Sequence, residues 1–297
     1  MVLVADSGST KTDWRLIDEQ TRKSISIFSE GLNPYFLTEN QILDILRAKV
    51  VPFVSNVDKI YFYGAGCGLP LKAIEVKNAL DQALPTSGGA MVTGDTLAAA
   101  RSVLKDSSGI CCILGTGSNG FVYDGQSITA TVPSLGYMFS DWGSGTVLGK
   151  DFLGLILQER IPQAIRTDFN QTFNLDRIQI LQSIYNKPMA NRFMASFSHF
   201  IFKYAEEEPV KSLILENFRQ FFHYYVLQFQ EFKTFKKVSM VGSIGYHFKK
   251  YILQVAGELG IVVEKIIKNP MDGLVDYHSA NTSGEPKHEV SNSSSNV

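Results

Sequence analysis

Two glycine-and-hydroxyl turns recur in this chain: Asp6-Ser7-Gly8-Ser9-Thr10-Lys11-Thr12-Asp13 after the apolar run 1–5, and Gly115-Thr116-Gly117-Ser118-Asn119 after the apolar run 110–114. Each places small residues where a strand is expected to end. Small residues at a sharp turn let backbone N–H groups and hydroxyls converge on an anion without obstruction by larger side chains. The two turns therefore predict two halves of one phosphate-binding site, and a nucleotide's phosphates would fit between them.

The turns also indicate an internal repeat, because a second extended segment follows each of them, at 13–18 and 120–124. Each unit reads strand, tight turn, antiparallel strand. This pattern differs from a P-loop, for which the sequence has no Gly-x4-Gly-Lys-Ser/Thr string. It also differs from a dinucleotide fingerprint, because Gly115-Thr116-Gly117 leads into an extended segment and not into a helix.

Apolar periodicity predicts the remaining elements. In the first unit we expect strands at 2–5, 13–17, 24–28, 58–63 and 90–93, with helices at 38–54, 71–84 and 96–104. Thr38 and Gln41 form a capping box at the start of the first helix. The second unit predicts strands at 110–114, 120–123, 127–132, 238–241 and 262–267. Its helices are expected at 143–160, 174–186, 188–207, 209–233, after Gly245, and at 271–278.

Composition favours a globular protein that binds small molecules. The 297 residues are 44% apolar and 19% charged, and 28 basic against 29 acidic residues give a net charge of −1. Such a balance offers no basic field for nucleic acid or an anionic membrane. The N-terminal apolar run is short and has no basic residues before it, so we expect a cytoplasmic protein. Cys67, Cys111 and Cys112 are expected to be buried thiols.

The repeated β-β-β-α-β-α-β-α unit, with a third glycine turn at 241–245, resembles the actin, sugar kinase and Hsp70 superfamily. Five strings, at 6–13, 31–34, 93–95, 113–119 and 140–145, resemble N-acetylglucosamine kinases of the BadF/BadG/BcrA/BcrD ATPase family. The resemblance implies two tandem ribonuclease H-like (actin-like ATPase) domains, each with a five-stranded mixed sheet, facing each other across an ATP cleft. The expected domains are 1–107 and 108–278, the second with a helical insertion at about 143–233, followed by a disordered polar tail at 279–297.

Two carboxylates carry the expected chemistry. Asp6 ends the first strand, where a carboxylate suits a hydrated Mg²⁺ bound to nucleotide phosphates, although an Asp before Ser-Gly also caps turns. Asp95 follows a strand and precedes a helix, so it is either an N-cap or the general base that accepts a proton from a sugar hydroxyl. The Thr-x-Asp position of the sugar kinases favours the base.

The turns supply the expected ATP contacts. We expect the nucleotide to bind to Gly8, Ser9, Thr10, Lys11, Gly115, Thr116, Gly117, Gly242 and Ser243. Lys11 is nearly as well explained as a solvated hairpin lysine. An ordinary hairpin is the alternative for Gly115–Gly117, and it is disfavoured because Asn119-Gly120 already supplies a hairpin turn. A strand-to-helix connection would also need Gly242 for steric reasons.

The sugar is expected to contact polar residues in glycine-rich loops, with Asp95 at the reacting hydroxyl. These residues are Asn33, Ser118, Asn119, Gly136, Tyr137 and Asp141. Asn33 before Pro is also a turn former, and Asp141 could instead cap a helix. Tyr137 or Trp142 could stack on a pyranose ring. The family usually has Gly-Asp-Glu-Gly-Ser where this chain has Ser140-Asp141-Trp142-Gly143-Ser144, so the missing acid leaves the hydroxyl specificity open.

The sequence thus predicts an ATP-dependent phosphotransferase for an amino sugar, most simply N-acetylglucosamine at its 6-hydroxyl, with ATP and Mg²⁺. The alternatives are an activator-type ATPase, whose iron–sulfur cysteines are missing here, and a non-catalytic ATP- or sugar-sensing domain. No zinc site is expected from the spacing of the five histidines. The aromatic residues at helical spacing between 193 and 229 are expected to be helix core or a dimer face, so a homodimer stays open.

Overall fold

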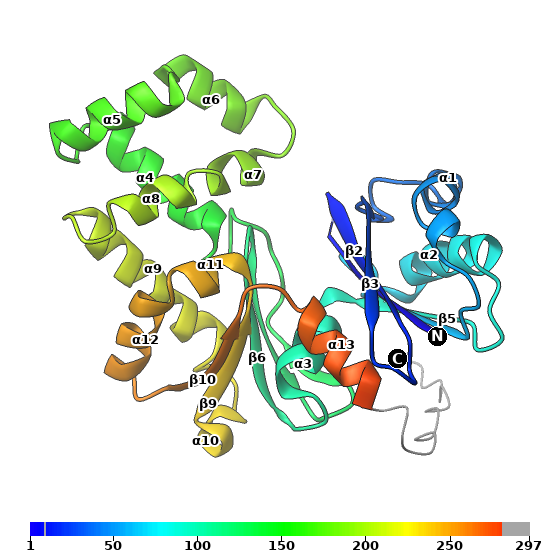
Figure 1. Ribbon diagram of the computed structural model, residues 1–297. Helices are drawn as coiled ribbons and strands as arrows, with labels where there is room; N and C mark the ends of the chain where they lie inside the picture. Colours follow the sequence, from blue (N-terminus) through cyan, green and yellow to red (C-terminus); the bar gives the residue numbers. More distant parts are fainter. Residues whose placement is uncertain (9, 281–297) are drawn as a thin grey trace, which may run out of the picture.

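The structure, a computed structural model, describes residues 1–8 and 10–280 (Figure 1). Ser9 and most of the predicted tail, 281–297, lie outside the described residues. The C-terminal helix α13 (Met271–Ala280) extends two residues into the segment that was predicted as tail.

Two five-stranded sheets repeat one topology. The first contains β1 (Val2–Ser7), β2 (Lys11–Ile17), β3 (Ser24–Glu30), β4 (Lys59–Gly64) and β5 (Ala90–Gly94), in the order β3-β2-β1-β4-β5. The second contains β6 (Gly109–Leu114), β7 (Ser118–Tyr123), β8 (Ile128–Thr131), β9 (Lys237–Val241) and β10 (Val262–Ile267), in the order β10-β9-β6-β7-β8. In both sheets three antiparallel strands are extended by two parallel ones. The predicted α/β fold of two tandem units with mixed sheets is confirmed.

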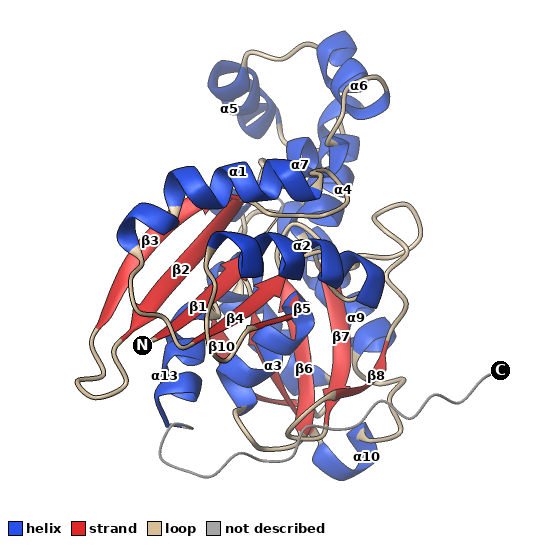
Figure 2. Cartoon of the chain, turned by 90° about the vertical axis from the view of Figure 1, so that its right-hand side faces the viewer, coloured by secondary structure: helices blue, strands red, loops and turns tan. Residues whose placement is uncertain are grey.

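Side chains of β1 alternate between two helical layers, as the period of a strand requires. Leu3 and Ala5 pack with α1 (Glu39–Lys49) and α2 (Pro70–Ala83) on one face. Val2 and Val4 pack with α3 (Asp95–Leu104) and α13 on the other. Helix α3 also contacts β6 and β9 of the second sheet, so it packs between the two sheets (Figures 1 and 2).

The helical insertion follows β8; its α5 and α6 extend away from both sheets, whereas its later helices α9 and α10 contact the second sheet (Figure 1). It contains α4 (Gly145–Leu157), α5 (Gln163–Phe173), α6 (Arg177–Tyr185), α7 (Ala190–Ala195), α8 (Ser198–Lys203), α9 (Val210–Tyr225) and α10 (Phe232–Phe235). After β9 the chain forms α11 (Ser243–His247) and α12 (Lys249–Glu258).

The aromatic residues of the insertion that were predicted as core are largely buried, with Phe197, Phe218 and Tyr225 at most 1% exposed. Cys111 and Cys112 are buried on opposite sides of β6, as alternation predicts.

Several predicted boundaries were wrong, for identifiable reasons. The capping box at Thr38 is present, but α1 ends at Lys49 and a short 3-10 turn, η1 (Val51–Phe53), follows, because Pro52 disfavours helix in the residue before it. Helix α5 was missed because it is mostly polar and fully buries only Ile165 and Phe169. The segment 188–207 is two short helices, and 209–233 breaks after Tyr225.

The Asn119-Gly120 pair is not a turn, contrary to expectation. Both residues lie inside β7, opposite Ile113 and Cys112 of β6. Glycine is needed at 120 because a Cβ there would collide with the carbonyl oxygen of Tyr225 in α9. The hairpin turn is Gly115–Gly117 itself, so the argument that Asn119-Gly120 supplied it fails.

No helix among residues 1–8 and 10–280 combines the length and apolar character that crossing a membrane would require.

Candidate active site

Both predicted turns are tight hairpins at the end of the first strand of a sheet. Gly8 N donates to Lys11 O at 3.0 Å, and Gly115 N donates to Gly117 O at 2.9 Å. Hydrogen bonds of the buried Ser7 side chain hold the first hairpin in place. Ser7 Oγ lies 2.8 Å from Thr12 Oγ1 and accepts from Leu32 N at 3.0 Å. Thr10 and Lys11 are exposed at its tip.

Asp6 lies at the end of β1, in register with Tyr63 of β4 and Asp13 of β2. Burial and, to a smaller extent, the negative charge of Asp95 raise the pKa of Asp6, and the positive charge of Lys11 lowers it, so that the pKa is about 7. An ordinary aspartate titrates near 4. The two carboxylates named by the sequence are therefore close enough to act on each other electrostatically.

Asp95 is the first residue of α3, whose N-cap is Gly94. The interpretation of Asp95 as the N-cap is therefore wrong. Burial raises the pKa of the Asp95 carboxyl, while the N–H groups of Thr96 and of Asp95 itself lower it. Burial and the charge of Asp95 together raise the pKa of the Cys67 thiol to about 12, so this thiol stays protonated at neutral pH.

Asn33 is buried and shapes the loop after β3. Its Oδ1 accepts from Tyr35 N at 2.9 Å, and its carbonyl accepts from the N–H groups of Phe36 and Leu37. Gly66 has φ +85°, and a Cβ there would lie 2.6 Å from Asn33 Oδ1. The turn-forming role of Asn33 is thus present, and contact with a sugar stays a prediction.

Asp141 folds back onto the second hairpin. Its backbone is left-handed, with φ +65°, and its N–H donates to the Tyr225 hydroxyl at 2.8 Å. One carboxylate oxygen accepts from Ser118 N at 3.2 Å, and a Cβ on Gly117 would lie 3.3 Å from both carboxylate oxygens. The N-cap of α4 is Ser144, so the capping interpretation of Asp141 is wrong.

The other predicted sugar residues are less closely grouped. Ser118 Oγ donates to Trp142 O at 2.7 Å, and Asn119 Oδ1 accepts from Gly120 N at 2.8 Å. Tyr137 is half-buried against the insertion core, and Gly136 before it has φ +70°. Trp142 stacks on Tyr224, with ring centroids 4.2 Å apart. Its face toward Tyr224 is therefore occupied by the protein.

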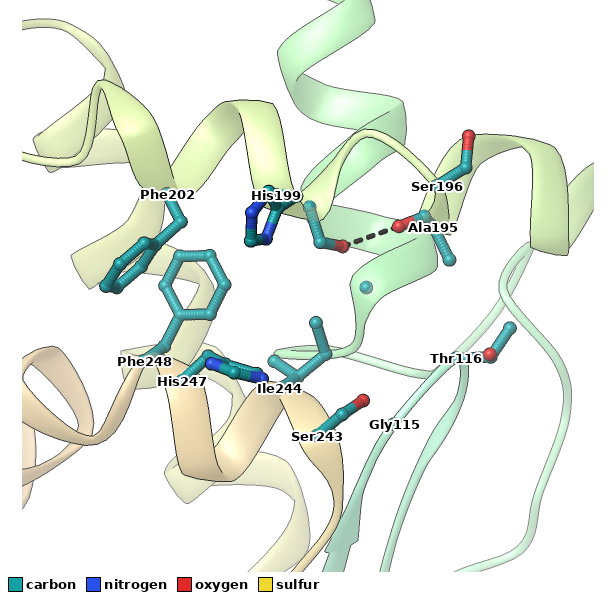
Figure 3. A pocket seen from close by; sticks show the side chains of 12 residues that line it. Gly115, Thr116, Ala195, Ser196, His199, Phe202, Ser243, Ile244, His247 and Phe248 are labelled. Carbon is teal, nitrogen blue, oxygen red and sulfur yellow. Dashed lines mark hydrogen bonds between the residues drawn. The ribbon is translucent and has the colours of Figure 1, made fainter. Parts of the chain in front are cut away.

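A pocket of about 240 Å³ adjoins the second hairpin (Figure 3). Gly115, Thr116 and Ser243 form its polar end, and Phe202 and Phe248 meet edge to face at 5.3 Å at the other end. The start of α4 is fixed to this hairpin, because Gly145 N donates to Gly115 O at 2.9 Å and Thr146 Oγ1 donates to Thr116 O at 2.6 Å. The remaining lining residues are Gly145, Ala195, Ser196, Ser198, His199, Ile244 and His247.

Gly242 has a steric role beside this pocket. Its φ is +132°, and a Cβ would collide with the carbonyl of Leu114 at the end of β6.

The sequence analysis missed four residues that line the pocket, His199, Phe202, His247 and Phe248. His247 could have been found, because it follows Ser243 by one helical turn; His199 and Phe202 reach the pocket only through the packing of α8.

The family model described as the BadF/BadG/BcrA/BcrD ATPase family matches residues 5–258. The chain belongs to this family. ATP use follows from that membership, and the resemblance noted in the sequence is confirmed.

Solved structures agree on the fold. A protein from Porphyromonas gingivalis, proposed to be an N-acetylglucosamine kinase, is 38% identical with a TM-score of 0.89, over 95% of this chain and 100% of that chain. A protein from Chromobacterium violaceum with the same proposed activity is 14% identical, with a TM-score of 0.70, over 93% and 98%. A ROK family glucokinase from Streptomyces griseus, in complex with glucose and AMPPNP, is 15% identical with a TM-score of 0.57, over 95% and 99%. No curated protein sequence gives a significant match.

Proposed function

We propose that this chain is an ATP-dependent sugar kinase that phosphorylates an amino sugar, N-acetylglucosamine at its 6-hydroxyl. The observation that carries the proposal is a pair of carboxylates with raised pKa values, Asp6 and Asp95, of which Asp95 raises the pKa of Asp6 through its charge, in a chain of an ATPase family. The choice of sugar rests on the 38%-identical neighbour, itself proposed to be an N-acetylglucosamine kinase.

Asp95 is proposed as the general base. Its pKa is raised from that of an ordinary aspartate toward neutral pH. A carboxylate with a higher pKa accepts a proton more readily, which favours proton transfer from a sugar hydroxyl as that oxygen attacks the γ-phosphorus. The buried surroundings also keep competing water away from the reacting atoms.

Asp6 is proposed to hold Mg²⁺. Its partly buried carboxylate faces the negative charge of Asp95, and a divalent cation would stabilise the ionised form that burial disfavours. When bound, the metal neutralises charge on the β- and γ-phosphates. Gly8, Ser9, Thr10 and Lys11 are proposed to contact the phosphates from one side, and Gly115, Thr116 and Gly117 from the other.

The pocket beside Gly115 and Thr116 is proposed to receive the nucleoside. Its aromatic end, with Phe202 and Phe248, suits a purine, and its polar end leads to the hairpin that would bind phosphates. Gly242 and Ser243 would lie beside the ribose.

The acceptor sugar is proposed to contact Asn33, Ser118, Asn119, Gly136, Tyr137 and Asp141. Asp141 is the best supported of these residues, because burial raises the pKa of its carboxyl and only one backbone N–H, from Ser118, is shown to offset this. Such a carboxylate gains from accepting hydrogen bonds from sugar hydroxyls.

The activator-type ATPase is not favoured. Cys111 and Cys112 are buried on opposite faces of β6, and Cys67 is buried beside Asp95, so these thiols do not converge on one cluster.

A substrate panel tests the proposal. ADP release is measured with ATP, Mg²⁺ and, in turn, N-acetylglucosamine, N-acetylmuramic acid, N-acetylmannosamine and glucose. We expect slow release without sugar and stimulation by N-acetylglucosamine. If no sugar of this or a wider panel stimulates ADP release, the kinase function is wrong, and nucleotide binding without turnover would then point to a sensing domain.

A further inference from the structure

A chain of two hydrogen bonds, one buried and one half-buried, lies on the face of the first sheet that α3 and α13 cover. Arg101 Nη1 donates to the Tyr63 hydroxyl at 2.8 Å, and this hydroxyl lies 2.9 Å from His278 Nε2. Tyr63 is 0% exposed and His278 is 5% exposed. Three elements distant in sequence, β4, α3 and α13, are therefore joined by two hydrogen bonds in the interior.

A guanidinium can only donate, so the Tyr63 oxygen accepts from Arg101. We assign the proton of the neutral His278 ring to Nδ1, because Nε2 then accepts the Tyr63 proton and both hydrogen bonds of the Tyr63 hydroxyl are made. Burial, together with the positive charges of Arg101 and Lys59, lowers the pKa of His278 to about 3. The imidazole thus remains an acceptor throughout the neutral range.

Aromatic rings enclose this chain of bonds. Tyr61 stacks on His278 with ring centroids 4.0 Å apart, and the Arg101 guanidinium lies 5.2 Å from the Tyr277 ring centroid. In β7 of the second sheet, burial raises the pKa of Tyr123, and the positive charge of Arg101 partly offsets this rise. Helix α3, which carries Arg101, packs against both sheets (Figure 1).

Two of these three residues, Tyr63 and Arg101, lie on or next to the elements that carry the candidate carboxylates. Tyr63 is the direct in-register neighbour of Asp6 in the parallel pair β1 and β4. Asp95 begins α3, and fewer than two helical turns separate it from Arg101. The hydrogen bond from Arg101 to Tyr63 therefore ties the helix that carries Asp95 to the strand position beside Asp6.

We infer that Tyr63, Arg101 and His278 form a positioning network that holds Asp95 at a fixed place relative to Asp6. None of the three would touch the substrate. The network acts by preventing α3 from sliding or rotating against β4, because a small misplacement of a general base lowers the rate of proton transfer steeply. This inference rests on the proposed function, in which Asp95 is the base.

Tyr63→Phe tests the network, because it removes one hydroxyl and keeps the ring. We expect kcat with the best sugar to fall by roughly 10- to 100-fold, while the KM values for sugar and ATP stay within about twofold. Tyr61→Phe is the matched control, because Tyr61 lies two residues earlier on the same strand and face and its hydroxyl is not part of the chain of bonds. It should keep wild-type kcat.

Substitutions of His278 give a second, independent test of the network. His278→Gln retains an acceptor for the Tyr63 proton and should retain most of kcat, whereas His278→Leu should lower it as Tyr63→Phe does. Hydrogen exchange should become faster in α3 and α13 of Tyr63→Phe and remain unchanged in α9, which lies in the insertion.

The inference is overturned if Tyr63→Phe lowers only the melting temperature and leaves kcat unchanged, or if His278→Gln and His278→Leu lose activity equally. A change in KM alone would also overturn it, because it would indicate a binding defect and not misplacement of the base. Failure of the proposed function looks different: the unchanged chain would then show no sugar-dependent turnover with any panel sugar.

Discussion

Asp6 and Asp95 have the same side chain, and we propose separate roles for them from their positions in the fold. Replacing Asp95 with Asn keeps the size of the side chain and removes the proton acceptor. We expect kcat to fall by roughly 10²- to 10⁴-fold while ATP affinity and the fold persist, as measured by steady-state kinetics, calorimetry and circular dichroism. Near-normal turnover of Asp95→Asn would show that the base lies elsewhere, with Asp141 the next candidate.

Asp6→Asn should affect metal use and not proton transfer. The neutral amide is a weaker ligand for Mg²⁺ than a carboxylate, so the Mg²⁺ concentration for half-maximal rate should rise. Titration of ADP release with Mg²⁺ measures this. An unchanged Mg²⁺ requirement would contradict the proposed metal role.

The raised pKa of Asp6 also predicts how stability depends on pH in metal-free buffer. Folding favours the protonated form, so the stability that Asp6 contributes is complete below about pH 4, its ordinary pKa, and is lost as the pH rises through about 7. Asn does not titrate. Relative to the wild type, Asp6→Asn should therefore gain free energy of unfolding between pH 5 and pH 8 in urea denaturation. Parallel pH profiles for the two proteins would show that Asp6 titrates normally.

The positions of candidate residues were predictable where they depended on local sequence. The two turns, Asp6 at a strand end and Asp95 at a helix start could all be located from the residues around them. The contact of Asp141 with Ser118 could not, because it joins positions 23 residues apart through a left-handed backbone at 141. For the same reason the aromatic end of the pocket was missed, since Phe202 and Phe248 meet only after α8 and α11 have packed.

At the level of elements, substitution by alanine should change the stability of the protein in opposite directions at two glycines of α4. A Cβ on Gly149 would collide with the carbonyl of Met194 in α7, whereas a Cβ on Gly154 would meet nothing within 4 Å. Gly149→Ala should destabilise the protein by about 1–3 kcal/mol through overpacking. Gly154→Ala should stabilise it by about 0.5–1 kcal/mol, because alanine favours helix over glycine.

Urea denaturation of both variants measures the difference. Because α4 begins at the contact with Gly115 and Thr116, Gly149→Ala should also weaken ATP binding, and Gly154→Ala should not. Equal stability of the two variants would contradict the close packing of α4 against α7.

Element prediction succeeded for segments with a clear period and failed where tertiary contacts override local signals. The strands of both sheets and α1 to α3 follow from alternation and caps. Asn119-Gly120 is a strong turn signal that lost to the packing of α9 on β7. Helix α5 carries so little apolar surface that only its place in the insertion explains it.

At the scale of the whole molecule, the chain links its two sheets at α3 and again at α13. The boundary near 105–108 was predicted from a polar stretch, and we still propose a hinge there between the predicted domains 1–107 and 108–278, with α13 moving together with the first sheet on which it packs. The packing of α13 on β1 and β2 shows, in addition, that the end of the described chain returns to the first sheet. This return could not be predicted from the local sequence of α13. It depends on an apolar face of β1, far away in the sequence, that α13 covers.

Closure of the two bodies on ligands is the expected motion, because exclusion of water favours phosphoryl transfer over hydrolysis. The radius of gyration from small-angle scattering should decrease when an ATP analogue and N-acetylglucosamine bind together. An unchanged radius, with binding of both ligands established by calorimetry, would argue against closure.

The central claim is that the γ-phosphoryl group of ATP is transferred to a sugar. Mass spectrometry of the products formed from ATP, Mg²⁺ and N-acetylglucosamine tests this most directly, with Asp95→Asn as the control. We expect one N-acetylglucosamine 6-phosphate for each ADP with the wild type, and little of either product with the variant. ADP and inorganic phosphate without a phosphorylated sugar would identify a hydrolase and contradict the account.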